Sequence, residues 1–207
     1  MYEVYLVPLG SGLIPSLRPL VLSIILGLEE ESSDYFNKVN TLLNQIKMAV
    51  GTYEFYDAIW TGLLISPHHR LAIINFILKN IPTNATNEEL MEVCVNNTKL
   101  VSTALSAALQ DNGQLVIRGS LEILVKYFPV EKRFFETQQL VDLFKASMNV
   151  LTRKDMSLTR RFYSWILTTG AAETEILPEY NLNILILALK VNFKKTCILN
   201  LPYLFRN

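Results

Sequence analysis

A pattern that recurs at intervals of 42 to 47 residues constrains the fold of this chain more than any other feature. Arg70–Pro82 and Arg118–Pro129 each consist of an arginine, an apolar helical segment, a lysine and a proline. Arg160 and Arg161 then precede a third apolar segment. Periods of about 40–47 residues are typical of HEAT and armadillo repeats, in which helix pairs bury their apolar faces by stacking on one another.

The recurrence predicts an all-α fold of stacked antiparallel helix pairs, a HEAT/armadillo-like α-solenoid. The helices that follow Arg70, Arg118 and Arg160/Arg161 should then lie next to one another, roughly parallel, on one side of the array. Because the copies match only loosely, a non-repeating helical domain is the alternative.

The composition favours helices and a single domain. Half of the 207 residues are hydrophobic, and glycine and proline number eight each, which suits long helices better than a β-sandwich with many turns. We expect one domain over residues 1–195 and an irregular tail over residues 196–207. The 19 basic and 19 acidic residues balance, which argues against a nucleic-acid-binding protein. The most apolar stretches, Pro19–Leu28 and Tyr180–Leu189, carry no charge but reach only about half of a membrane span, so we expect no span.

Apolar residues at a period of 3.6, together with residues that start or stop helices, predict the positions of the helices. Gly51 should end one helix, and Ser66 should cap another with Pro67 at its first position. Thr83–Glu89 is polar and should be a loop. The expected helices are Pro15–Leu28, Ser33–Val50, Thr52–Ile65, Ser66–Ile81, Leu90–Val95, Thr98–Gln110, Gln114–Phe128, Gln138–Arg153, Ser157–Thr168 and, more weakly, Asn181–Lys194, with Tyr2–Val7 as the end of another.

No set of residues in the sequence predicts catalysis or a bound cofactor. His68 and His69 are adjacent and therefore point about 100° apart on a helix, so we expect solvated side chains rather than metal ligands. Phosphate-binding loops, nucleophile elbows and zinc-protease motifs are absent from the sequence. Cys94 and Cys197 are far apart, which indicates reduced thiols. The sequence favours a protein that is not an enzyme and needs no cofactor, and an enzyme is only the third hypothesis.

Basic residues gather in one part of the sequence, which makes them the candidate interaction patch. Against the single acid Asp155, this region holds Lys145, Arg153, Lys154, Arg160 and Arg161. One interpretation is structural, because cations at a helix C-terminus stabilise its dipole. The functional interpretation is contact with an acidic partner or with an anionic phospholipid surface.

The segment Asp155–Leu167 predicts a well-defined helix. Asp155 is suited to accept hydrogen bonds from the first backbone N–H groups. Leu158, Phe162 and Trp165 then fall on one helical face with Ile166. This string resembles the signature helix of the Dopey family, large cytosolic scaffold proteins. Three further stretches resemble the family's amino-terminal domain, in the same order and at similar spacing: Gly27–Glu31, Phe55–Pro82 and Ile117–Gly119.

The resemblance implies a non-enzymatic scaffold in transport between endosomes and the Golgi apparatus. Implied partners are a large Arf-exchange-factor-like scaffold, a P-type lipid flippase and a motor. The implied location is cytoplasmic, with peripheral association with Golgi and endosome membranes. Family members are many times longer, and the chain lacks the family's first helices, so the resemblance implies part of a larger domain. A peripheral membrane module that binds anionic phospholipid through the basic patch is the alternative function.

Overall fold

The structure is a computed structural model that describes residues 7–153, 155–167 and 182–190. These residues form helices and connecting turns, with no strand among them. The α-helices are α2 (Leu17–Ile25), α3 (Phe36–Val50), α4 (Thr52–Ile65), α5 (Arg70–Asn80), α6 (Asn87–Val93), α7 (Thr98–Leu109), α8 (Gln114–Tyr127), α9 (Thr137–Thr152) and α10 (Met156–Ile166). Residues 182–190 form one more helix, and short 3-10 helices cover Val7–Ser16, Leu26–Leu28, Pro67–His69 and Val130–Lys132.

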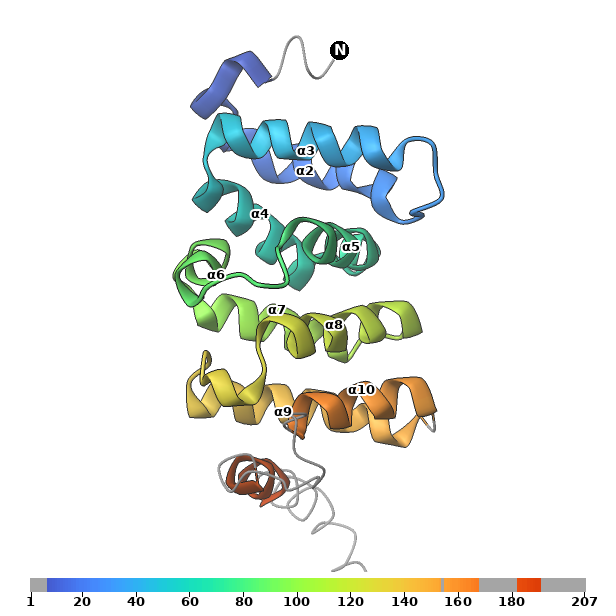
Figure 1. Ribbon diagram of the computed structural model, residues 1–207. Helices are drawn as coiled ribbons and strands as arrows, with labels where there is room; N and C mark the ends of the chain where they lie inside the picture. Colours follow the sequence, from blue (N-terminus) through green and yellow to red (C-terminus); the bar gives the residue numbers. More distant parts are fainter. Residues whose placement is uncertain (1–6, 154, 168–181, 191–207) are drawn as a thin grey trace, which may run out of the picture.

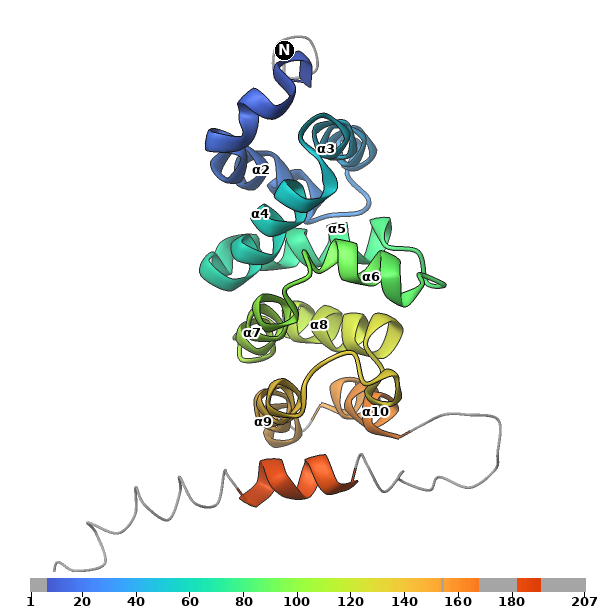
Figure 2. The same cartoon turned by 90° about the vertical axis from the view of Figure 1, so that its left-hand side faces the viewer.

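The helices stack in two parallel columns, as Figures 1 and 2 show. One column consists of α4, α7 and α9, each packed on the next. The other consists of α5, α8 and α10, which are the three helices of the recurring sequence pattern. This arrangement confirms the all-α solenoid of antiparallel helix pairs and the predicted adjacency. Within the second column, α8 and α10 run side by side, whereas α5 is turned and is seen more nearly end-on in Figure 1.

Side chains one repeat apart in the sequence touch in the structure, and these contacts fix the stacking. The Tyr127 hydroxyl of α8 donates to the carbonyl oxygen of Ile81 at 2.8 Å. In the next repeat, Trp165 Nε1 of α10 donates to the carbonyl oxygen of Phe128 at 3.0 Å. Both rings are buried, so their polar atoms need hydrogen-bond partners inside the core. Each finds one in a carbonyl oxygen at the end of the preceding helix of the column.

Close packing between α5 and α8 depends on a glycine. A Cβ at Gly119 would come within 2.4 Å of Ile74 Cγ2, so any larger residue would require the Ile74 side chain or one of the two helices to move. Around this contact the core contains fully buried aromatic rings from several helices, among them Phe55, Trp60, Phe76 and Phe144. The continuous core runs from α2 to α10, as stacking of helix pairs requires.

Pro8–Leu28 is long and apolar enough, by length and composition alone, to cross a membrane. The expectation of no membrane span considered only uncharged stretches, whereas Pro8–Leu28 contains Arg18. Length and composition alone do not make this segment a span. The segment is not one regular helix, since Gly10 has a positive φ of 52° inside the 3-10 helix. Leu17, Val21 and Ile25 of α2 are buried, and α2 packs on α3 and α4. One face of α2 is therefore buried in the stack, while Arg18, Pro19 and Ser23 on its other face are exposed.

Several helix boundaries and caps differ from the prediction. Helix α3 begins at Phe36 rather than Ser33, without a side-chain cap. Helix α6 begins inside the predicted loop, since Thr86 and Glu89 form a reciprocal capping box. Ser66 caps no backbone group; its hydroxyl lies 2.6 Å from Nδ1 of His69, which is half-buried rather than solvated. The helix predicted for Tyr2–Val7 and the tail predicted for residues 196–207 lie outside the described residues, apart from Val7.

A basic groove between α8 and α10 as candidate functional site

Three residues of the predicted basic patch do not form a common surface that the structure describes. Lys145 Nζ lies 2.8 Å from Asp142 Oδ1, one turn away on α9. Arg153 donates from Nη2 to the carbonyl oxygen of Asp111 at 2.6 Å and from Nη1 to that of Asn112 at 3.3 Å. Lys154 lies outside the described residues. Lys145 is therefore paired with a neighbouring acid, and Arg153 ties the end of α9 to the turn between α7 and α8.

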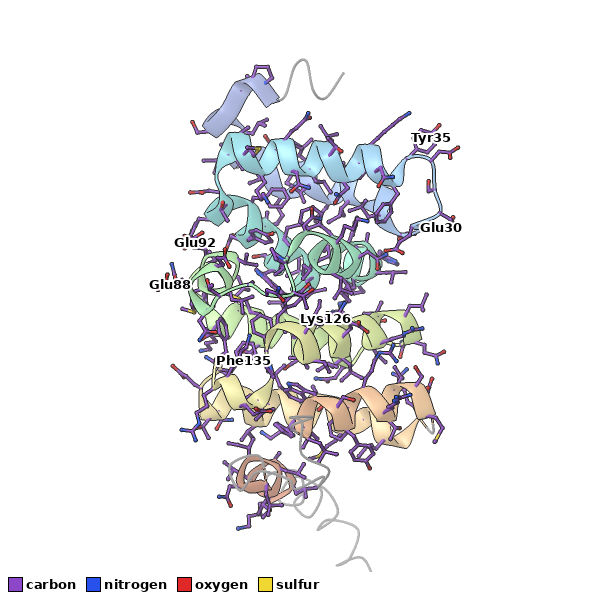
Figure 3. The ribbon with its side chains drawn as sticks, in the orientation of Figure 1. Glu30, Tyr35, Glu88, Glu92, Lys126 and Phe135 are labelled. Atoms are coloured by element: carbon purple, nitrogen blue, oxygen red, sulfur yellow. The ribbon has the colours of Figure 1, made fainter. Side chains whose placement is uncertain are left out.

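The other two residues of the patch, Arg160 and Arg161, line a groove between α10 and α8. The groove has a volume of about 290 Å³ and is lined by Glu122, Val125, Lys126, Arg160, Arg161 and Ser164. We call it the α8–α10 groove. It forms because the inward faces of both helices are apolar, with Leu121 and Leu124 of α8 and Phe162 of α10 buried. The charged residues are left on the outer faces, where the two helices lie side by side (Figure 3, which labels Lys126).

Glu122 lies at the centre of the charged residues in the groove. Its carboxylate oxygens lie 3.1 Å from Lys126 Nζ and 3.2 Å from Arg161 Nε. Partial burial raises the pKa of Glu122, but hydrogen bonds from Lys126 and Arg161 and their charges lower it further, so the net shift is downward. Arg161 also donates from Nη1 to Ser157 Oγ at 2.8 Å. Glu122 is therefore ionised at neutral pH and holds both cations in place.

Arg160 differs from its neighbour Arg161. Its side chain is exposed, and its guanidinium makes no hydrogen bond or ion pair with the part of the chain that the structure describes. Only its backbone is engaged, because Ser164 Oγ donates to the Arg160 carbonyl oxygen at 2.9 Å. The groove thus holds three cations against one carboxylate, and one of those cations is available to a ligand.

The outer face of α10 extends this surface. Met156, Thr159, Tyr163 and Leu167 border a wider open hollow that shares Arg160, Arg161 and Ser164 with the groove. Met156 and Tyr163 are exposed, with relative accessibilities of 85% and 48%. Apolar and cationic side chains therefore adjoin on the same helix.

Other reactive groups in the structure do not converge on a site. Within the described ranges, no three His, Cys, Asp or Glu side chains come close enough to hold a metal ion. Cys94 is buried, and this burial raises the pKa of its thiol, which makes it a poor nucleophile. Glu29, Glu30 and Glu31 are exposed in the turn before α3 (Figure 3 labels Glu30).

The sequence interpretation missed Lys126 and Glu122 as parts of the site. It grouped cations by closeness in the sequence, whereas the structure groups them by closeness between successive repeats. The separation of 39 residues between Glu122 and Arg161 is about one repeat, so the recurrence itself held the signal. Aligning the Arg118–Pro129 segment with the segment after Arg160 would have placed the two charged faces side by side.

Comparison with known proteins gives consistent matches. The family model "Dopey, N-terminal" matches residues 1–171. Protein DOP1 homolog of Drosophila pseudoobscura pseudoobscura is 32% identical over 181 residues, and Protein DOP1B of Mus musculus is 32% identical over 187 residues. Protein pad-1 of Caenorhabditis elegans is 30% identical over 168 residues. These alignments cover 87%, 86% and 81% of this chain but only 7%, 8% and 7% of the relatives. No solved structure matches.

Proposed function

Because this chain belongs to the Dopey family, we propose that it acts as a non-enzymatic interaction module in vesicle-mediated protein transport between endosomes and the Golgi apparatus. The match of the family model over residues 1–171 is the observation that carries this proposal. The stacked architecture supports it, since helical repeats present extended surfaces to partners. The proposed location is cytoplasmic, on the surface of Golgi and endosome membranes.

The proposed partners are those implied by the family: a large Arf-exchange-factor-like scaffold, a P-type lipid flippase and a motor. The chain spans less than a tenth of the three relatives named above, so it would supply one contact surface of a larger assembly. The α8–α10 groove, with its unpaired Arg160, is the described surface best suited to such a contact.

Affinity capture from cytosol tests this function. The purified chain, whose helical content and cooperative melting are checked first, is immobilised, and captured proteins are identified by mass spectrometry. We expect reproducible enrichment of endosome and Golgi transport proteins over an unrelated helical-repeat protein on the same support. Capture of the same set by both proteins would contradict the proposal.

A second candidate is a peripheral membrane module that binds anionic phospholipid, and the exposed, unpaired Arg160 favours it. Each basic residue close to an anionic surface contributes about 1 kcal/mol, so several must act together. Lys145 and Arg153 are already engaged in contacts within the fold, which leaves few free charges. We therefore expect weak sedimentation of the chain with anionic vesicles.

A further inference from the structure

We infer that the α8–α10 groove binds an extended acidic segment of a partner protein, with its carboxylates at Arg160 and Lys126. The partner class is therefore a protein with an acidic segment. The inference shares with the proposed function only the assumption that the chain is a binding module. It is carried by the juxtaposition of α8 and α10 side chains, which no single stretch of sequence contains.

The shape of the groove fits an extended chain better than a compact ligand. Its volume of about 290 Å³ is at the lower limit for small-molecule pockets, and it is open along its length between two helices that run side by side. Val125 and the aliphatic parts of Lys126 and Arg160 give it apolar walls, while their charged groups stay in water. A peptide backbone can lie along such a channel with alternate side chains reaching its edges.

The charges of the groove are arranged so that an acidic residue can bind without breaking an existing pair. Glu122 is already neutralised by Lys126 and Arg161, and Arg160 has no partner of its own among the described residues. The Lys126 ammonium has three donors and its side chain is 38% exposed, so it can contact a second carboxylate while it keeps Glu122. An arginine and a carboxylate can form two parallel hydrogen bonds, which gives orientation as well as attraction.

The same arrangement favours a peptide over a bilayer surface. The Glu122 carboxylate lies between two of the three cations, so a flat anionic surface that covered the groove would also meet this negative charge. A peptide can place its carboxylates beside Arg160 and Lys126 and leave Glu122 free of repulsion. The exposed Met156 and Tyr163 further along α10 offer contacts to apolar residues in the same segment.

Fluorescence anisotropy with the complete chain tests the inference. The probe is a fluorescein-labelled peptide of about ten residues, rich in glutamate with two leucines, which spans about 33 Å when extended. Arg160→Glu and Lys126→Glu should each weaken binding about tenfold or more, because attraction is replaced by repulsion. The matched control is Lys99→Glu, a reversal at an exposed lysine on α7 in the other column, which should change the affinity by less than about twofold.

Two further measurements make each outcome decisive. Urea melts establish that all variants fold, so that loss of binding reports on the groove. Raising the salt concentration should weaken wild-type binding, since the groove is open to solvent. If wild type and groove variants bind the peptide with equal affinity, the groove is not the binding site. Groove-dependent sedimentation with phosphatidylserine vesicles, without peptide binding, would overturn the choice of a peptide. Either result leaves the affinity-capture test of the proposed function standing, because that test does not depend on this groove.

Discussion

Arg70 and the pair Arg160/Arg161 are counterparts in the recurring sequence pattern, yet the structure uses Arg70 and Arg160 differently. Arg70 donates to the carbonyl oxygens of Leu63 and Leu64 and pairs with Asp111 Oδ2 at 2.7 Å, with only 11% of its side chain exposed. Arg160 is exposed and, within the described ranges, unpaired. An arginine in the corresponding part of two repeats therefore stabilises the stack in one case and is available for binding in the other.

The contrast extends to the acids that face these arginines. Asp111 lies in the turn between α7 and α8, where the Gly113 N–H donates to it at 2.7 Å and Arg153 donates to its backbone carbonyl oxygen. Contacts to Asp111 therefore come from the repeats on both sides. Glu122 instead pairs with Lys126 of its own helix and Arg161 of α10, at the edge of an open groove. Charges that connect repeats through turns are structural, whereas charges left on the outer faces of helices form the candidate site.

The largest effect should come from the buried side of α10. Trp165 is 2% exposed, and its ring lies 4.8 Å from that of Phe144, so Trp165→Ala should lower the free energy of unfolding by about 3–5 kcal/mol. Urea denaturation measures this loss. Tyr163→Ala, on the exposed side of the same helix, is the control and should change stability by about 0.5 kcal/mol or less. A near-neutral Trp165→Ala would mean that α10 is not anchored by this face.

Removal of the Arg70 side chain should have the next largest effect. Arg70→Leu breaks an ion pair that is largely shielded from solvent and two hydrogen bonds to backbone carbonyl oxygens, so we expect a loss of about 2 kcal/mol in urea denaturation. The equivalent change at the groove, Arg160→Leu, provides the comparison. Equal losses from both substitutions would abolish the distinction between the two arginines.

The pH dependence of stability separates the two regions further. Burial raises the pKa of Asp111, but hydrogen bonds from Gly113 and Arg70 and the charge of Arg70 bring it below its ordinary value. A carboxyl whose pKa is lower in the folded state stabilises the fold above its unfolded pKa of about 3.9 and loses this contribution as the pH falls through the folded pKa. The difference between wild type and Arg70→Leu should therefore shrink between about pH 4 and pH 2 in urea melts. A difference that stays constant over this range would mean that Asp111 does not depend on Arg70.

The smallest effect on stability should come from Arg160 itself. Arg160→Ala removes an exposed side chain without a partner among the described residues, so the free energy of unfolding should change by about 0.5 kcal/mol or less. Thermal or urea denaturation checks this. A loss above about 1 kcal/mol would show that Arg160 supports the fold and is not free for a ligand.

Much of this fold could be predicted from the sequence. The recurrence identified α5, α8 and α10 as neighbours, and Asp155 caps α10 by accepting from the N–H groups of Ser157 and Leu158, as expected. Thr52–Ile65 was predicted with its observed bounds. These features depend on local chemistry and on a periodicity that a single sequence contains.

The partners of the charged side chains could not be predicted in the same way. Arg153 and Arg160 are only seven residues apart, yet one binds carbonyl oxygens of the preceding repeat and the other is exposed. Their surroundings are set by side chains about 40 residues away in the sequence. Because the repeats match only loosely, their alignment does not show which residue of one repeat faces which residue of the next. Sequence reasoning therefore identified the arginines of the groove but not Lys126 and Glu122 of α8, which complete it.

Backbone amide chemical shifts, recorded by NMR while the acidic peptide is added, test most directly whether the outer faces of α8 and α10 form a binding site. We expect shifts concentrated at Val125, Lys126, Arg160 and Ser164, with the amides of Arg70 and Asp111 unchanged. Shifts at the Arg70–Asp111 contact, or none on α8 and α10 at saturating peptide, would contradict this assignment.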